Sequence, residues 1–121
     1  MAKQVATLVI AHGSRRIASN EEFLNMVAQL QTCHPQEKFF GAFLEIATPD
    51  IPTGIDQVIS SGYENVKIFP FFLNQGTHVQ TDIPEIVAAK SLQYPQAKIE
   101  ILPYLGARPD FVDWLSRAVL K

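Results

Sequence analysis

The hydrophobic pattern of this chain alternates between two periods. Four short apolar runs are typical of strands that are covered on both faces, as in a parallel sheet; they are residues 5–11, 38–46, 65–73 and 97–105. After the first run, Phe23, Met26, Val27 and Leu30 follow one another at the spacing of an amphipathic helix. Similar spacing elsewhere predicts further helices, so that the helices cover residues 19–33, 48–61, 82–94 and the segment after Pro109.

Strands that alternate with helices predict an α/β fold. Short connections imply right-handed crossovers and a four-stranded parallel sheet in the order 2-1-3-4, with helices on both faces, as in a flavodoxin-type half. We expect a single domain over residues 1–121, since this length suits one domain with a core. In this order the crevice at the end of the first strand is a topological switch point, where open α/β sheets bind ligands.

Capping residues predict where two of the helices begin. Ser19, followed three residues later by Glu22, forms a capping-box pattern. Asp82, followed by Pro84 and Glu85, has the residue types of an N-cap, an early proline and a first-turn carboxylate. The polar segment before it, residues 74–81, predicts a flexible loop.

Composition and charge exclude several classes of partner. The net charge of −2 and the scattered basic residues argue against nucleic acid. The sequence has no apolar stretch near the roughly 20 residues that a membrane helix needs, and no signal-peptide pattern. We therefore expect a cytoplasmic protein with neither a nucleic-acid nor a membrane partner. Cys33 is the single cysteine, and we expect it to be a small, at least half-buried residue.

Three residues able to bind metals or transfer protons follow the predicted strands at the same edge of the sheet. His12 ends the first run, Glu45 ends the second, and His78 lies on the loop after the third. A carboxylate beside Phe43 is costly to desolvate unless it is paired, protonated or bound to a cation. Each histidine also has an ordinary explanation, since His12 can cap the strand and His78 can be solvated. Their predicted convergence favours a functional site.

Two imidazoles and a carboxylate suit a borderline divalent ion such as Co²⁺, Fe²⁺, Ni²⁺ or Zn²⁺, without selecting among them. The sequence has no Gly-rich phosphate loop, so we expect chemistry without a nucleotide. Gly13 and Ser14 let a ligand approach the backbone after His12, and Arg15 can meet an anionic group. His34 is left out of the site, because its predicted position at a helix end explains it.

Four stretches carry a resemblance that extends over nearly the whole chain. They are IAHGSR (10–15), AFLE (42–45), PFFLNQGTHV (70–79) with DIP (82–84), and PYLG (103–106) with Pro109. These stretches resemble the CbiX/SirB-type sirohydrochlorin chelatases, the small class II chelatases of tetrapyrrole biosynthesis, in their short single-domain form. The resemblance implies insertion of Co²⁺ or Fe²⁺, with Ni²⁺ as a further candidate, into sirohydrochlorin, for cobalamin or siroheme. It also implies a homodimer that closes the cleft around the tetrapyrrole by two-fold symmetry.

The same resemblance implies roles for the site residues. His12 and His78 are expected to be catalytic and to hold the partly dehydrated ion, while a histidine or the accompanying Glu45 accepts the pyrrolic protons. Residues 69–73 and the loop around Gly76 are expected to form a wall and a lid for the ring. Contacts with the tetrapyrrole are expected from Ser14, Arg15, Asn74, Gln75, Gly76 and Thr77.

Two other functions stay open from the sequence. A non-catalytic carrier of a divalent metal or a tetrapyrrole would use the same ligands without accelerating insertion. A phosphohistidine enzyme built on His12 is less favoured, because Ala11 stands where an arginine precedes the histidine in such phosphatases.

Overall fold

The computed structural model describes residues 5–121, except for the side chains of residues 78 and 79. Strands and helices alternate as β1 (Val5–Ala11), α1 (Ile17–Cys33), β2 (Phe39–Phe43), α2 (Ile51–Ser60), β3 (Asn65–Pro70), α3 (Ile83–Gln93), β4 (Lys98–Ile101) and α4 (Pro109–Val119). A π-helical turn, η1 (His78–Asp82), leads into α3, and a 3-10 turn, η2 (Leu105–Ala107), precedes α4. The predicted succession of elements is confirmed.

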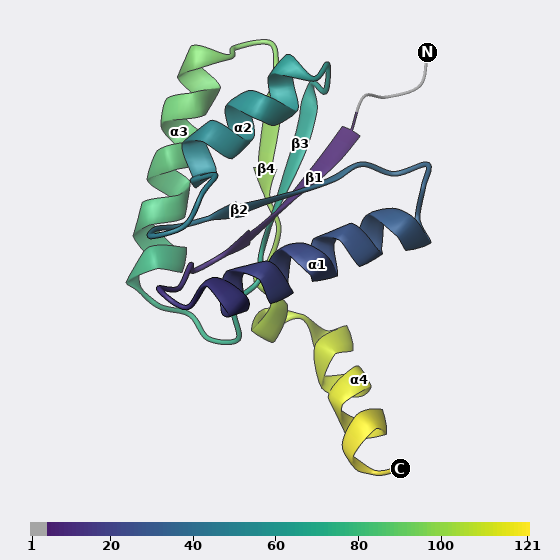
Figure 1. Ribbon diagram of the computed structural model, residues 1–121. Coiled ribbons are helices and arrows are strands. Elements are labelled where there is room, and N and C mark those ends of the chain that lie inside the picture. The colour runs from purple at the N-terminus through teal and green to yellow at the C-terminus, as the bar shows by residue number, and fades with distance from the viewer. Residues whose placement is uncertain (1–4) are drawn as a thin grey trace.

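The strands form one parallel sheet in the order β2-β1-β3-β4, as predicted. Leu8 of β1 pairs with Phe40 of β2 on one side and with Ile68 of β3 on the other. Because all four strands run in the same direction, the C-terminal ends of β1, β2 and β3 lie at one edge of the sheet (Figure 1). Helices cover both faces, which is also confirmed.

The face covered by α2 and α3 contains the larger core. Alternate residues of β1 and β3 point into it, and each of its members is at most 8% exposed. The members are Ala6, Leu8, Ile10, Ala42, Ile51, Ile55, Val58, Val66, Ile68, Ile83 and Val87. Ile83 and Val87 of this core come from α3.

The opposite face is covered less completely. α1 packs on β1 and β2 through a smaller cluster of Val9, Phe23, Val27 and Phe43. On β3 and β4 the same face carries exposed charged residues, such as Lys67. The prediction that the third strand is buried on both faces is therefore wrong: α1 covers the β1 and β2 half, and the other half lies open.

Three local predictions differ from the structure. α1 begins at Ile17 with Arg16 as its N-cap residue, so Ser19 does not begin a capping box. Asp82 has helical backbone angles, φ −68° and ψ −44°, because η1 continues directly into α3 where a loop was expected. Cys33 is exposed rather than half-buried.

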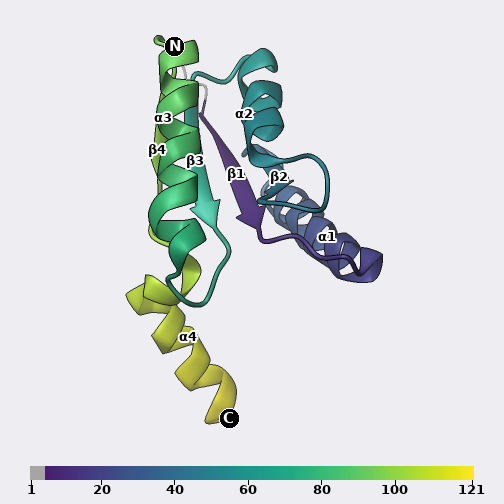
Figure 2. The same cartoon turned by 90° about the vertical axis from the view of Figure 1, so that its left-hand side faces the viewer.

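The C-terminal helix α4 extends away from the sheet, as two perpendicular views show (Figures 1 and 2). None of its residues is buried. Over residues 5–121, no helix combines the length and the apolar character needed to cross a membrane.

Candidate functional site

The ends of β1 and β2 bring His12 and Glu45 together, as predicted. The backbone N–H of Leu44 donates to the carbonyl of Ala11 at 2.8 Å, and that of Glu45 donates to the carbonyl of His12 at 3.1 Å. These bonds extend the strand pairing and set both side chains side by side. Nε2 of His12 lies 2.9 Å from Oε2 of Glu45, and the two side chains are 48% and 50% exposed. The pair is therefore preformed and open to a ligand.

The backbone around this pair is constrained on both sides. Gly13 has a φ of 97°, and a Cβ there would overlap with the carbonyl oxygen of Glu45. Glycine at this position allows the two strand ends to approach closely. Ile46 has a φ of 74°, a left-handed conformation that costs on the order of 1–3 kcal/mol for a residue other than glycine. Such strain is concentrated at functional sites, and here it turns the chain sharply after Glu45.

Asn20 holds the turn that follows His12. Its side-chain Oδ1 accepts from the backbone N–H of Ser14 at 2.9 Å, and its Nδ2 donates to the carbonyl of Ser14 at 2.8 Å. The first turn of α1 is thereby bonded to the loop that carries the histidine. Asn20 was not among the residues predicted from the sequence to belong to the site. Its signal was the polar cluster at residues 19–22, because asparagine near a helix start commonly bonds to nearby backbone groups.

A cavity of about 470 Å³ opens beside His12 on the α1 side of the sheet. Its walls are mainly apolar and come from β1, α1, the end of β2 and the segment after β3. The lining residues are Ala11, His12, Gly13, Ser14, Ser19, Asn20, Glu22, Phe23, Met26, Phe43 and Phe71. A mainly apolar hollow with a few polar groups is the usual form of a small-molecule site.

A second hollow, also about 470 Å³, lies on the other side of Glu45 toward α3. Glu45, Asp82 and Glu85 line it together with Leu44, Ile86 and Ala89. Carboxylates grouped around one hollow raise the local concentration of cations. Among the side chains that the structure describes, no three His, Cys, Asp or Glu residues are grouped so that they could hold one metal ion.

The segment after β3 completes the same edge. The ring of Phe72 meets the ring of His12 edge-to-face, with 6.4 Å between centroids. The N–H of Gly106 donates to the carbonyl of Phe72 at 3.0 Å, and a Cβ on Gly106 would overlap with the carbonyl of Leu73. The PYLG stretch therefore supports the loop that follows β3, a contact that no local sequence pattern indicates.

The other predicted contact residues are less closely grouped. Ser14 lines the cavity, whereas its neighbour Arg15 is exposed and is not among the lining residues. Residues 74–77 (Asn74, Gln75, Gly76 and Thr77) are all exposed on the loop after β3. The backbone of His78 begins η1, but its side chain lies outside the described residues, so its approach to His12 stays a prediction.

A paired imidazole and carboxylate at the switch point of a parallel sheet define an α/β protein with a site suited to metal ions and proton transfer. The family model of CbiX matches residues 6–121, and the chain belongs to this family.

Relatives of known name agree with this assignment. The chain is 30% identical over 84 residues to a sirohydrochlorin cobaltochelatase of Methanothermobacter thermautotrophicus, covering 69% of this chain and 58% of the relative. It is 33% identical over 102 residues to the chloroplastic sirohydrochlorin ferrochelatase of Arabidopsis thaliana, covering 82% of this chain and 44% of the relative. The chain thus spans about half the length of these curated relatives.

A solved structure shows the same fold. The sirohydrochlorin chelatase SirB from Bacillus subtilis subspecies spizizenii, in complex with cobalt, superposes with a TM-score of 0.83 at 24% identity. The superposition covers 97% of this chain and 50% of that one.

Proposed function

We propose that this protein inserts a divalent metal ion, Co²⁺ or Fe²⁺, into sirohydrochlorin without using a nucleotide. The observation that carries the proposal is the preformed pair of His12 and Glu45, with 2.9 Å between its nitrogen and oxygen, beside a mainly apolar cavity. The family membership and the names of the matched relatives support the same reaction.

Insertion requires that the ion lose water and that the ring lose two pyrrolic protons. An imidazole nitrogen binds a metal through its lone pair, so Nε2 of His12 must be free of its proton when the ion arrives. Glu45 lies within hydrogen-bond distance of that nitrogen and is suited to accept protons there. We propose His78 as the second metal ligand. A site with few protein ligands favours transfer of the ion to the ring.

The surroundings of the pair fit this division of roles. The apolar walls of the cavity, including Phe23 and Phe71, offer a surface for part of the macrocycle. The carboxylates of the second hollow, including Asp82 and Glu85, favour the approach of a cation from the other side. We propose that the carboxylates of the ring are bound by Ser14, Arg15, Asn74, Gln75, Gly76 and Thr77.

We further propose that residues 1–121 act as one chelatase domain of a cytoplasmic homodimer. A single sheet edge offers one wall for a flat macrocycle, and a second copy would supply the other. The described part of the chain has the fold of half of the Bacillus chain, which agrees with this arrangement.

The test is a metal-insertion assay in which sirohydrochlorin is mixed with Co²⁺ or Fe²⁺ and the reaction is monitored by the absorbance of sirohydrochlorin. We expect the protein to accelerate the spectral change, and His12→Ala and His78→Ala to abolish the acceleration while circular dichroism stays native. His34→Ala is the matched control, since this histidine is exposed at the C-terminal end of α1. A wild-type rate in His12→Ala contradicts the proposed role, and binding without acceleration indicates a carrier.

A further inference from the structure

The turn directly after Glu45 is strained. The backbone N–H of Ala47 donates to the carbonyl of Glu45 at 2.8 Å, and Ile46 between them has a φ of 74°. These are the hydrogen bond and the φ of a classic γ-turn, which is a rare and strained conformation. A positive φ is a genuine outlier for a β-branched residue, whereas glycine adopts it at little steric cost.

Packing on both sides holds this turn in place. Leu44 packs against the larger core under α2 and α3, whereas Ala47 packs against the smaller cluster under α1. The N–H of Phe43 donates to the carbonyl of Pro49 at 2.9 Å, which closes the loop. The chain passes from one face of the sheet to the other between Leu44 and Ala47, and this explains why the strained backbone persists.

The side chain of Ile46 lies beside the His12–Glu45 pair rather than in a core. Ile46 is 59% exposed, so burial within the chain offsets little of the strain. The carbonyl of Glu45 that closes the γ-turn also lies against Gly13, where a Cβ would overlap with it. The strained turn is therefore in direct contact with the turn after His12, and it presents an aliphatic side chain to solvent next to the pair.

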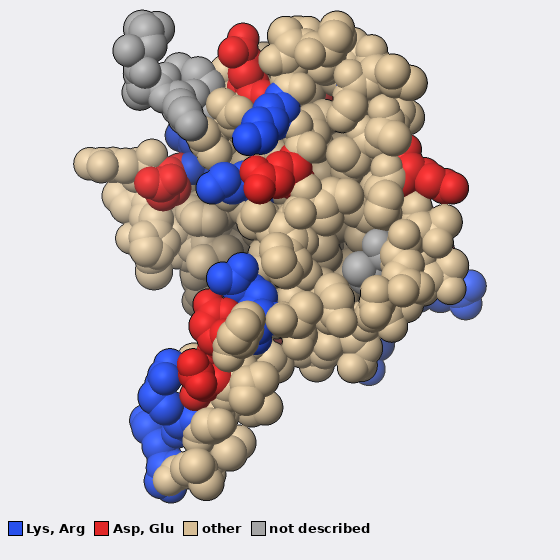
Figure 3. All heavy atoms as spheres, turned by 180° about the vertical axis from the view of Figure 1, so that it is seen from behind, with Lys and Arg blue, Asp and Glu red and all other residues tan. Residues whose placement is uncertain are grey.

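Charge alone does not favour the binding of an anionic ring. Acidic and basic side chains lie next to one another on the side of the molecule seen in Figure 3, and the whole chain has a net charge of −2. A surface of mixed sign exerts little long-range attraction on an anion. Sirohydrochlorin carries its carboxylates around the periphery, so apolar contact with the flat ring has to supply much of its affinity.

We propose that the side chain of Ile46 contacts the apolar face of the tetrapyrrole when the ring lies over the His12–Glu45 pair. The proposal rests on the chelatase function proposed above and adds a substrate-binding residue to it. An ion held by His12 can enter the ring only if the ring centre reaches that ion, so the side chains next to the pair must touch the ring. An aliphatic group there matches the ring face, and the strain at Ile46 fixes its direction.

The test measures the Kd for metal-free sirohydrochlorin from its absorbance change, and separately the kinetics of insertion. Ile46→Gly keeps the turn, because glycine adopts this φ freely, but removes the side chain. The Kd and the KM for sirohydrochlorin should rise at least about 5-fold. The kcat should stay within about twofold, since a contact made equally in the ground and transition states changes KM alone.

Stability and two further variants separate binding from a structural role. The urea midpoint of Ile46→Gly should be no lower than that of the wild type, because relief of strain offsets the small loss of packing. Ile46→Leu keeps an aliphatic side chain and should keep the wild-type Kd. Leu92→Ala is the matched control, because this leucine is 85% exposed at the C-terminal end of α3; its Kd should be unchanged.

The other outcomes overturn the inference. A wild-type Kd in Ile46→Gly, or an equal rise in Leu92→Ala, would show that Ile46 does not contact the ring. A lower urea midpoint in Ile46→Gly, with a raised Kd that Ile46→Leu does not restore, would make its role purely structural. The proposed reaction is judged separately: a protein that binds sirohydrochlorin through Ile46 without inserting metal refutes the reaction alone, and an active protein whose KM is independent of Ile46 refutes this inference alone.

Discussion

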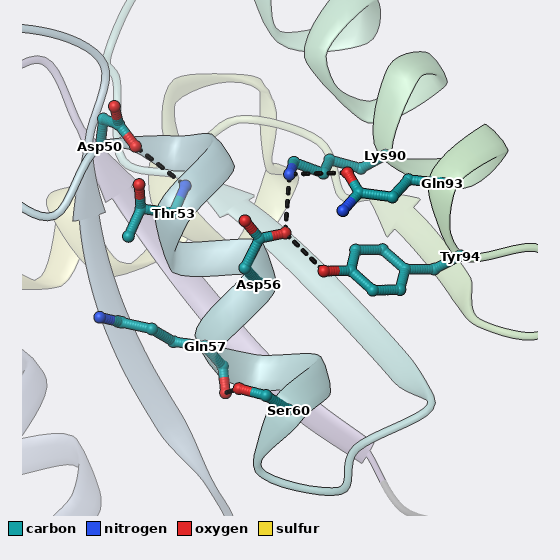
Figure 4. A network of polar contacts seen from close by, with 8 residues as sticks. All are labelled: Asp50, Thr53, Asp56, Gln57, Ser60, Lys90, Gln93 and Tyr94. Carbon is teal, nitrogen blue, oxygen red and sulfur yellow. Dashed lines mark hydrogen bonds and ion pairs between the residues drawn. The ribbon is translucent and has the colours of Figure 1, made fainter.

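The two faces of the sheet are built to different degrees of completeness. The face under α2 and α3 is closed, with Leu8, Ile55 and Ile68 fully buried. Hydrogen bonds also join the two helices at the surface of this face. Asp56 of α2 accepts 2.7 Å hydrogen bonds from Lys90 in α3 and from Tyr94 just after it (Figure 4). The face under α1 is closed over β1 and β2, while toward β3 and α4 it leaves apolar side chains exposed.

This difference suggests that the closed face mainly stabilises the fold, whereas the open part of the other face is available for contacts with other molecules. A closed, interdigitated core supplies most of the free energy of folding. Large apolar patches that remain exposed on a folded chain usually mark contact with a ligand or another protein. The candidate site lies at the sheet edge where the closed core supports the strand ends and the cavity beside His12 opens toward α1.

Ile55→Ala should have the largest effect on folding. Removing this buried side chain from the closed face should lower the free energy of unfolding by about 2–5 kcal/mol. Val119→Ala, on exposed α4, should change the stability of the monomer by less than about 0.5 kcal/mol. Urea unfolding of dilute protein measures both, and equal losses would contradict the contrast between the faces.

Gly13→Ala should have the second largest effect on stability, and it should affect the site directly. Alanine at this φ costs about 1–2 kcal/mol, and the overlap with the Glu45 carbonyl should raise the total to about 2–3 kcal/mol. Because the two strand ends must separate, insertion activity should also fall. Gly62→Ala is the control: its φ is 103°, but no atom lies within 4 Å of the added Cβ. Full activity in Gly13→Ala would refute the need for close approach.

Asn20→Ala should have an intermediate effect. Loss of its two bonds to Ser14 should cost about 1–2 kcal/mol and, by loosening the turn after His12, reduce kcat for insertion. Gln31→Ala is matched, since Gln31 also bridges backbone groups, at Glu37 and Phe39, but away from the site. Equal kcat in the two variants would show that Asn20 has a structural role without influence on the reaction.

The smallest expected effect is the pH dependence contributed by Asp56. The hydrogen bond from the Lys90 ammonium, and secondarily that from Tyr94, holds the pKa of Asp56 below its ordinary value of 3.8. Because the folded pKa is the lower one, this stabilisation is present above pH 3.8 and is lost as the pH falls through the folded pKa.

Asp56→Asn should remove that acid-dependent contribution. It should amount to less than about 1 kcal/mol, since the Asp56 side chain is 42% exposed. Urea unfolding at several acidic pH values measures it, with Asp113→Asn on exposed α4 as the control. A variant that keeps the wild-type acid dependence would place its origin elsewhere.

Much of the site could be predicted from the sequence because it follows strand order. Apolar runs and helical spacing predicted the order 2-1-3-4, and that order alone implies that His12 and Glu45 meet. Asn20 and Gly106 could not be predicted in the same way. Asn20 contacts Ser14, and Gly106 contacts the segment after β3. Both contacts depend on the tertiary positions of the start of α1 and of the turn that contains Gly106.

The sequence by itself determined the fold class, the strand order and the edge at which the site residues gather, because the period of apolar positions is a local property of the chain. The tertiary structure decided that half of one face stays open, that α4 extends from the body, and that the turn after His12 is held by Asn20. The sequence pattern of an apolar helix face is the same whether that face is buried by its own chain or left exposed for another molecule. Only the packing of the elements distinguishes a buried face from an exposed one.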